Sequence, residues 1–163
     1  MPTNCSPTAR ISQFAEIEES RIDTEFTLGS GSVIDSFVKV KMAGGTGHIR
    51  IGENTTINSG CVLYSGNGIK IGNYVAIAAN CTFAPTNHEF GNREMLIAQQ
   101  KFQPSRGGIV VEDDVWIGAG CVLLDGAILR KGCVIGALSL VRGEVPRFSI
   151  QCGNPLRLIG WRE

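Results

Sequence analysis

Two histidines are the main candidates for acid–base chemistry in this chain, and they lie in different settings. His88 follows Asn87 at the start of a long polar segment, residues 86–108. An imidazole titrates near neutral pH, so His88 is the natural general base for taking a proton from a hydroxyl or an amine. A solvated loop histidine is the alternative interpretation. His48 follows Gly47 just before a strand-like segment, and we expect it to be structural.

The six cysteines do not form a metal-binding pattern. The sequence has no CxxC pair and no His–Cys cluster, so zinc is not indicated and we expect no metal. Cys5 and Cys152 lie outside the repeat described below. Four others take its small-residue position, where reduced thiols act as compact apolar fillers: Cys61, Cys81, Cys121 and Cys133. Free core thiols fit a reducing compartment, so we expect a cytoplasmic protein.

These residues must be positioned by a repeat of bulky apolar residues at every sixth place. The series runs Ile22, Leu28, Ile34, Val40; Ile51, Ile57, Leu63; Ile71, Ile77, Phe83; and Val111, Ile117, Leu123, Leu129, Ile135, Val141. A period of six fits neither an α-helix nor a simple alternating strand. It is typical of a β-solenoid, in which three hexads make one coil of roughly eighteen residues and coils stack as parallel strands about 4.8 Å apart.

A second set of positions supports this interpretation. Four places after the bulky residue the sequence has a small or β-branched residue, as a narrow interior requires: Ser32, Thr55, Cys61, Val75, Cys81, Val115, Cys121, Ala127, Cys133, Ser139 and Val145. Charged residues fall between these positions, at corners and on the outer faces. The sequence therefore predicts an all-β parallel solenoid.

Interruptions of the repeat define the predicted organisation. Residues 1–21 carry a weak form of it and are expected to make an entry coil or cap. Residues 22–152 form the coil, and residues 86–108 leave it as a long excursion; such loops on rigid scaffolds are usually functional. Residues 153–163 begin Gly-Asn-Pro and continue with leucines, which favours a short capping helix.

Composition limits the function classes. The chain has 163 residues, enough for one domain, and a formal net charge of +0, so nothing indicates a nucleic-acid surface. It lacks a run of eighteen apolar residues and a basic start followed by an apolar stretch, so we expect neither a transmembrane segment nor a secretory signal.

Several motifs together resemble the left-handed β-helix acyltransferases. They are the six-residue repeat, Asn87-His88 at the start of the excursion, the run from Gly107 to Val111 that ends it, the run from Asp113 to Gly120, and Gly153-Asn154-Pro155. The nearest resemblance is to the branch with galactoside and maltose acetyltransferases and lipopolysaccharide or capsule O-acetyltransferases. It covers roughly residues 22–160.

The resemblance implies acetyl transfer from acetyl-CoA to a sugar hydroxyl, free or in a glycan precursor. The alternative is the same chemistry on an amino sugar, serine or a xenobiotic such as chloramphenicol, because acceptor sites come from loops and the fold does not choose among them. A zinc enzyme of the γ-carbonic-anhydrase type, which uses three histidines, does not fit a chain with 2 histidines. A purely structural role would not need the Asn-His loop.

The resemblance assigns roles to three residues in catalysis. His88 corresponds to the catalytic base. Ala119 corresponds to a coil residue whose backbone N–H stabilises the developing oxyanion, with plain coil packing as its alternative. Asn87 either orients the imidazole or shapes the turn.

Binding residues follow from the same resemblance. Asn58 matches an acceptor-binding position, with an ordinary polar corner as the alternative. Glu89 is a candidate to hold the imidazolium or the substrate, although it also fits a solvated loop carboxylate, and Trp116 is a candidate to wall the acceptor or pantetheine groove. The implied acetyl-CoA contacts are Gly118, Ala119, Ala137 and Ser139 along the coil edge, with Arg142 and Arg157 for the phosphates. For both arginines, solvated surface charge is the alternative.

The family also forms trimers with active sites between subunits, so the resemblance implies a homotrimer. The excursion would then reach onto a neighbour through its apolar residues, Phe90, Met95, Leu96, Ile97 and Phe102, which would otherwise be exposed.

Overall fold

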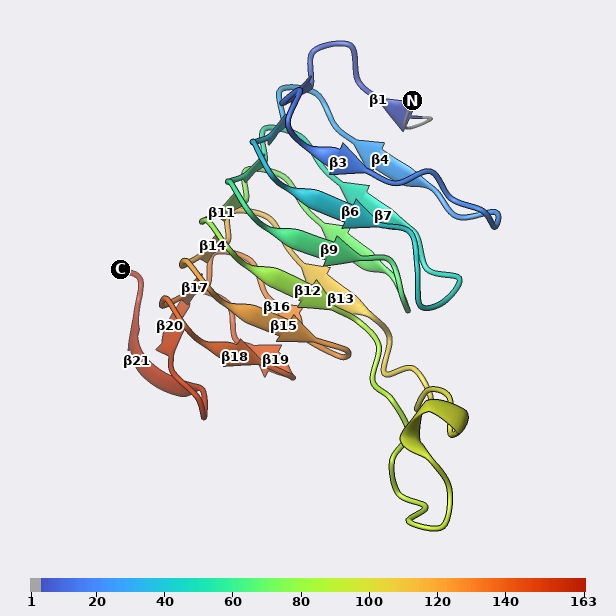
Figure 1. Ribbon diagram of the computed structural model, residues 1–163. Helices are drawn as coiled ribbons and strands as arrows, with labels where there is room; N and C mark the ends of the chain where they lie inside the picture. Colours follow the sequence, from blue (N-terminus) through green and yellow to red (C-terminus); the bar gives the residue numbers. More distant parts are fainter. Residues whose placement is uncertain (1–3) are drawn as a thin grey trace.

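Three parallel β-sheets form the sides of a tapering coil in the computed structural model, which describes residues 4–163 (Figure 1). Sheet A contains β1 (Asn4–Cys5), β4 (Phe26–Leu28), β7 (Ile49–Ile51), β10 (Ile69–Ile71), β13 (Ile109–Val111), β16 (Ile128–Leu129) and β19 (Glu144–Val145). Sheet B contains β2 (Arg10–Ile11), β5 (Val33–Ile34), β8 (Thr56–Ile57), β11 (Ala76–Ile77), β14 (Trp116–Ile117), β17 (Val134–Ile135), β20 (Ser149–Cys152) and β21 (Arg157–Trp161). Sheet C contains β3 (Glu16–Ile17), β6 (Lys39–Lys41), β9 (Val62–Tyr64), β12 (Thr82–Ala84), β15 (Val122–Leu124) and β18 (Leu140–Val141).

From β1 to β20, consecutive strands of the chain belong to different sheets, and each pairs with the strand one coil away. Within sheet B, for example, Ile57, Ile77, Ile117 and Ile135 are directly in register. This arrangement is consistent with a left-handed β-helix and confirms the predicted all-β parallel solenoid.

The core is a stack of the predicted bulky residues with the small residues at the corners between them. From Leu28 to Val141 every member of the six-residue series is buried. The small-position residues from Ser32 to Val145 are buried as well. Full burial stabilises a Leu, Ile or Val side chain by about 1.5–3 kcal/mol, so the repeat itself selects this winding.

Ile22 is the exception, and its predicted place in the series is wrong. Its side chain is 51% exposed because it lies in the loop between β3 and β4. The chain bends back there through a hydrogen bond from Thr24 N–H to the Ile22 carbonyl (2.6 Å). The series of the second coil therefore starts at Leu28.

An earlier coil precedes it. Strands β1, β2 and β3 pair in parallel with β4, β5 and β6, so residues 4–17 complete one further turn at the N-terminal end. Cys5, Ala9, Ala15 and Ile17 are only partly buried against the core. Residues 1–3, included in the predicted entry segment 1–21, lie outside the described residues.

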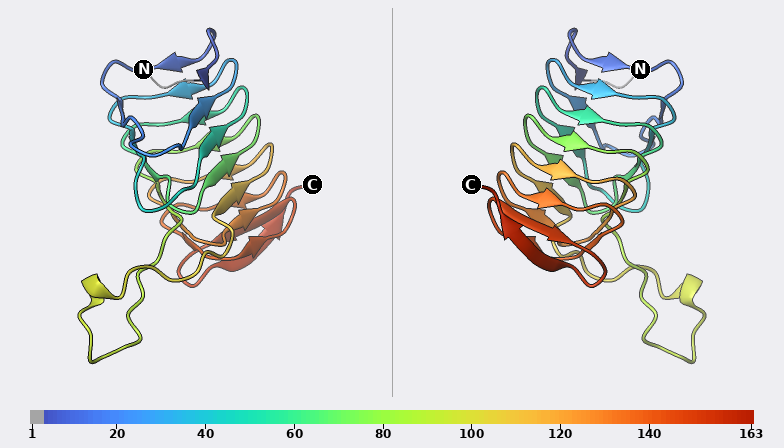
Figure 2. Two further views of the ribbon diagram at one scale, coloured as in Figure 1. Left: turned by 90° about the vertical axis from the view of Figure 1, so that its right-hand side faces the viewer. Right: turned by 90° about the vertical axis from the view of Figure 1, so that its left-hand side faces the viewer.

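The predicted C-terminal capping helix is wrong. The chain turns at Gly153, whose φ is +100°, and β21 runs back antiparallel to β20 (Figure 2). Leu156 alone of the tail packs against the core. The physical reason is the open edge of β20. A strand beside this edge forms hydrogen bonds with the backbone groups of β20, whereas a helix would leave those groups without partners.

Residues 86–108 leave one corner of the coil, between β12 and β13, and project well away from it (Figures 1 and 2). The excursion contains one short 3₁₀ turn, η1 (Ile97–Gln99). Within residues 4–163 no helix has the length and apolar character needed to cross a membrane.

Candidate functional site

His88 lies in a short two-stranded stem at the base of the excursion. Glu89 N–H donates to the Lys101 carbonyl (3.1 Å), and Gln103 N–H donates to the Asn87 carbonyl (2.9 Å). These bonds place His88 opposite Phe102 in an antiparallel bridge. The two rings pack with centroids 4.8 Å apart and planes tilted by 42°, so the stem fixes the position of the imidazole.

A buried carboxylate holds the other end of the excursion. Asp125 is 3% exposed. Its Oδ2 accepts from Arg106 N–H (2.7 Å) and its Oδ1 from Gly108 N–H (2.9 Å). Gly126 N–H also donates to the Gly108 carbonyl (2.7 Å). The excursion therefore returns to the coil at a fixed point.

His88 lines a pocket of about 280 Å³ on the outer side of sheet C. Its lining residues are Ala43, Gly44, Tyr64, Ala84, Thr86, His88 and Phe102. Neither imidazole nitrogen has a hydrogen-bond partner among residues 4–163, so the ring is available to take a proton from a bound hydroxyl or amine. Tyr64 was not singled out in the sequence; its place directly after buried Leu63 does indicate an outward side chain.

Within residues 4–163, neither Asn87 nor Glu89 forms a hydrogen bond to the His88 ring. One carboxylate oxygen of Glu89 serves its own turn: Oε1 accepts from Phe90 N–H and from Gly91 N–H, each at 2.8 Å. The Gly91 and Phe90 amides hold the pKa of Glu89 below its ordinary value. Asn87 contributes its carbonyl to the stem, which supports the turn-shaping alternative.

Ala119 lies at a different corner, between sheets B and C. Corner residues stack there from coil to coil: Gly120 N–H donates to the Ala79 carbonyl and Leu138 N–H to the Ala119 carbonyl, both at 2.9 Å. Ala119 is exposed, and no acceptor in the described part of the chain pairs with its own N–H. A developing negative oxygen could therefore be stabilised by this N–H.

The neighbouring cofactor candidates differ in accessibility. A Cβ at Gly118 would lie 2.5 Å from the backbone nitrogen of Ala137, so glycine is required for the close approach of two coils. Ala137 is exposed beside it. Ser139 is 2% exposed; its Oγ donates to the Gly136 carbonyl (2.6 Å) and accepts from Gly153 N–H (2.8 Å). The Ser139 side chain is thus used inside the coil.

Asn58 and Trp116 lie near the Ala119 corner. Asn58 Nδ2 donates to the Ile77 carbonyl (2.7 Å), which gives it a corner-forming role in a single chain. Trp116 points outward from sheet B and is 55% exposed. It stands between Ala76 and Val134 in the ladder.

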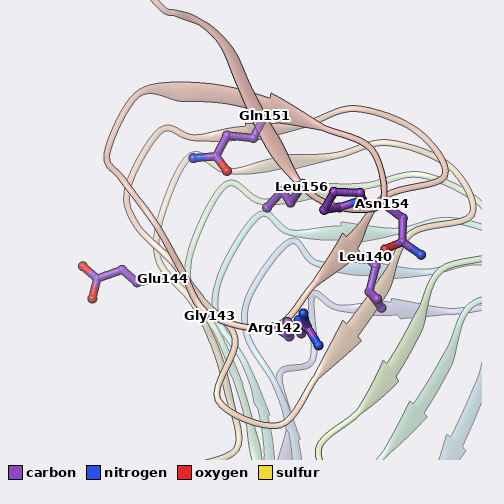
Figure 3. Close-up of a pocket in the computed structure, with 8 residues that line it drawn as sticks. Leu140, Arg142, Gly143, Glu144, Gln151, Asn154 and Leu156 are labelled. Atoms are coloured by element: carbon purple, nitrogen blue, oxygen red, sulfur yellow. The ribbon is translucent and has the colours of Figure 1, made fainter.

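Arg142 lines a second pocket, of about 310 Å³, at the C-terminal end of the coil (Figure 3). Gln151, Asn154 and Leu156 form other parts of its wall, and the Glu144 carboxylate points away from Arg142. Glu144 is paired instead with Arg130 (2.8 Å). Arg157, at the start of β21, does not line this pocket.

A single chain does not bring His88 and Ala119 together. Ala119 stacks on Ala79, at the start of sheet C, whereas His88 lies beyond the end of β12 on the far side of that sheet. Three strand residues at about 3.3 Å each separate the two corners by about 10 Å. Ala119 accordingly does not line the His88 pocket.

The described residues offer no group of three or more His, Cys, Asp or Glu side chains that could hold a metal ion. His48 has a structural role, because its Nδ1 accepts from Glu25 N–H (3.0 Å). The predicted core cysteines are buried and unpaired. Burial raises the pKa of the Cys133 thiol to about 12, as expected for an unreactive core residue.

Comparisons with known proteins agree with this architecture. Residues 108–143 match the bacterial transferase hexapeptide pattern of six repeats, and residues 48–82 match the hexapeptide repeat of succinyl-transferase. The crystal structure of the hexapeptide-repeat containing acetyltransferase VCA0836 from Vibrio cholerae O1 biovar eltor, complexed with acetyl coenzyme A, is 31% identical. It superimposes with a TM-score of 0.71 over 83% of this chain and 71% of that chain.

Two further similarities are more distant. A mutant of AntD, an N-acyltransferase from Bacillus cereus solved with dTDP and coenzyme A, has a TM-score of 0.82 at 20% identity, covering 98% of this chain and 84% of that one. WbbJ of Escherichia coli strain K12, assigned by name to lipopolysaccharide biosynthesis as an O-acetyl transferase, is 27% identical over 82% of this chain and 67% of its own length. This chain spans 38% of the length of an acetyltransferase-like relative from Mycobacterium tuberculosis, at 28% identity over 72% of this chain.

Proposed function

This chain belongs to the hexapeptide-repeat acyltransferase family, and from that premise we propose that it transfers an acetyl group from acetyl-CoA to a sugar hydroxyl. The observation that carries the proposal is His88, which is held in a fixed stem, lines a pocket, and has no hydrogen-bond partner for either ring nitrogen among residues 4–163. An imidazole in that setting is suited to general-base catalysis near neutral pH.

In the proposed reaction, His88 removes the proton of the acceptor hydroxyl as its oxygen attacks the thioester carbonyl. The negative charge that develops on the carbonyl oxygen is stabilised by the Ala119 N–H of a neighbouring copy. When the tetrahedral species collapses, the C–S bond breaks and the imidazolium returns its proton to the thiolate of coenzyme A. Within residues 4–163 neither the Ala119 N–H nor the His88 imidazole has a hydrogen-bond partner, which supports these roles.

The proposed acetyl-CoA groove follows the corner between sheets B and C. Exposed Ala119 and Ala137 leave room for an extended pantetheine chain beside the backbone. The groove leads toward the C-terminal pocket, which Arg142 lines together with Asn154, while the Glu144 carboxylate is paired with Arg130. We assign the coenzyme A phosphates to Arg142, and Arg157 keeps a secondary role.

A homotrimer with sites between subunits is part of the proposal. From β8 to β17 of sheet B and from β9 to β18 of sheet C, the outward strand residues are uncharged: Thr56, Ala76, Trp116 and Val134 on sheet B, and Val62, Tyr64, Thr82, Ala84, Val122, Leu124 and Leu140 on sheet C. Sheet A, in contrast, presents Arg50 and Lys70. The separation of His88 from Ala119 also favours a site completed by a second copy. Sedimentation showing a stable monomer at assay concentration would contradict the shared site.

The second candidate is the same reaction on an amine. AntD variants were solved with dTDP-4-amino-4,6-dideoxyglucose and coenzyme A, which keeps an amino sugar as an acceptor to be tested. A cytoplasmic location stays a prediction from the reduced core thiols.

Thiol release from acetyl-CoA, followed with a thiol reagent across sugars and amino sugars, tests the proposal. We expect His88→Ala to lower turnover by about 10²–10⁴-fold with little change in Tm, since the His88 side chain is exposed. Arg93→Ala is the matched control, because Arg93 lies in the same excursion and its one ion pair among the described residues is with adjacent Glu94. An unchanged rate in His88→Ala would exclude His88 as the base.

A further inference from the structure

The pocket beside His88 carries information about the acceptor itself. Its walls come from three successive coils and the excursion: Ala43 and Gly44 follow β6, Tyr64 ends β9, Ala84 ends β12, and Phe102 lies in the stem. Because the coils stack in fixed register, the spacing of these walls is set by the rigid scaffold rather than by the loop alone.

Charge is missing from this pocket. None of its seven lining residues is Asp, Glu, Lys or Arg. The nearest carboxylate along the chain, Glu89, is bound to the amides of Phe90 and Gly91. Lys41, in register with Tyr64, is paired with Glu16. Neither a cation nor an anion entering the pocket would meet a free counter-charge from the described residues. Binding a charged group there would therefore cost free energy, because the group would lose its hydration without gaining an ionic partner.

Two aromatic rings give the pocket its shape. Phe102 packs against the imidazole at 4.8 Å between centroids. Tyr64 is 42% exposed, and its hydroxyl has no hydrogen-bond partner among residues 4–163. An aromatic face with a free hydroxyl suits a ligand with an apolar ring face and hydroxyl groups at its rim. The volume of about 280 Å³ is just below the roughly 300–1,000 Å³ of sites for drug-sized ligands, so it suits one ring.

We propose that Tyr64 and Phe102 form the acceptor clamp of this enzyme and that the ring they hold is a single uncharged, hydroxyl-bearing ring, with His88 taking the proton of one hydroxyl. The inference rests on the proposed acetyl transfer. It excludes an ammonium or a phosphate on the ring that is acetylated, although charge elsewhere in a larger acceptor is compatible with it. Tyr64 donates or accepts a hydrogen bond at the ring edge, and Phe102 both contacts the ring and positions the imidazole.

The test compares three classes of probe that differ in charge: methyl glucopyranoside, galactopyranoside and mannopyranoside; methyl 2-amino-2-deoxyglucopyranoside, largely an ammonium at pH 7; and glucose 6-phosphate. The variants are Tyr64→Ala, Tyr64→Phe and Phe102→Ala. Tyr74→Ala is the matched control, because Tyr74 is also an exposed tyrosine (67%) but lies at the corner between sheets A and B.

We expect at least one uncharged glycoside to have the highest kcat/KM. Tyr64→Ala should raise its KM about tenfold, which corresponds to about 1.4 kcal/mol, and Tyr64→Phe should raise it less. Phe102→Ala should raise KM and lower kcat together, and Tyr74→Ala should change neither. Preference for a charged probe, or a KM within twofold of wild type in Tyr64→Ala, would overturn the clamp while leaving acetyl transfer intact.

Saturation-transfer NMR with the methyl glycosides gives a readout that does not depend on turnover. If no probe is acetylated, the proposed acetyl transfer is rejected. Binding of the methyl glycosides to the protein then tests the clamp on its own. Binding that is lost in Tyr64→Ala but kept in Tyr74→Ala supports the clamp, and no detectable binding of any methyl glycoside rejects it.

Discussion

The Asp125 carboxylate offers a sharp test of how the excursion is attached. Asp125→Ala removes both acceptors for Arg106 N–H and Gly108 N–H. Gly108 is buried, so its N–H is left without a partner, whereas water can reach Arg106, which is exposed. A hydrogen bond to a charged group contributes about 1.5–3 kcal/mol, and an unsatisfied buried donor costs about 1–3 kcal/mol.

The loss of the hydrogen bonds and the cost of the unsatisfied donor cannot simply be added, because both describe the same two amides. We therefore expect Asp125→Ala to reduce the free energy of unfolding by about 2–4 kcal/mol. For a chain of this size, each kcal/mol lowers Tm by about 2–4 °C, so the expected fall is about 4–16 °C. Asp125→Asn keeps one acceptor oxygen, so its Tm should lie between the Tm of Asp125→Ala and that of the wild type.

Calorimetry measures Tm, and amide hydrogen exchange followed by NMR locates the change. Exchange at Arg106 and Gly108 should accelerate by at least about 30-fold, the factor equivalent to about 2 kcal/mol. Asp23→Ala is the control, since it removes an exposed carboxylate from the loop between β3 and β4. A Tm within 1 °C of wild type together with unchanged exchange at both amides would refute the assigned anchor.

The remaining predictions concern thiols and pH. At neutral pH a thiol reagent should label at most Cys5 and Cys152 in the native protein and all six cysteines in denaturant, because the other four are buried; native labelling of more than two would contradict the core assignment. Hydrogen bonds from Arg130 hold the pKa values of Glu112 and Glu144 below their ordinary range. A lowered folded-state pKa stabilises the fold above the unfolded value of about 4.3 and loses this effect as pH falls through the folded value. Arg130→Met should therefore show a smaller loss of Tm between pH 7 and pH 3 than the wild type, and equal slopes would reject the Arg130 network as its source.

The six-residue period predicted most of the fold, because each bulky residue reports its own inward direction. The same rule does not tell where the series begins. Ile22 stands six places before Leu28 yet is exposed, since the intervening chain forms a loop rather than a strand. The C-terminal tail shows a similar limit: local residue preferences favoured a helix, whereas the open edge of β20, a partner distant in the coil, determined a strand.

The candidate site was predictable in its chemistry and less so in its surroundings. His88 could be identified from the break in the repeat. Tyr64 could not be placed beside it without the register of β9 against β12, which aligns residues twenty places apart. Ser139 illustrates a conflict within the sequence itself, because it fitted both an inward small position and a ligand groove. Its hydrogen bonds to Gly136 and Gly153 show that the side chain faces inward.

The reversal of β21 has a consequence for self-assembly. A parallel coil that ends in a bare sheet edge is a template on which the first coil of another molecule can dock, and repetition of that contact would build a fibre. Here the last strand of sheet B runs antiparallel to the rest, with a bulge between Ile150 and Gln151. An incoming parallel strand therefore finds neither matching polarity nor matching register, so end-to-end polymerisation through this sheet is disfavoured.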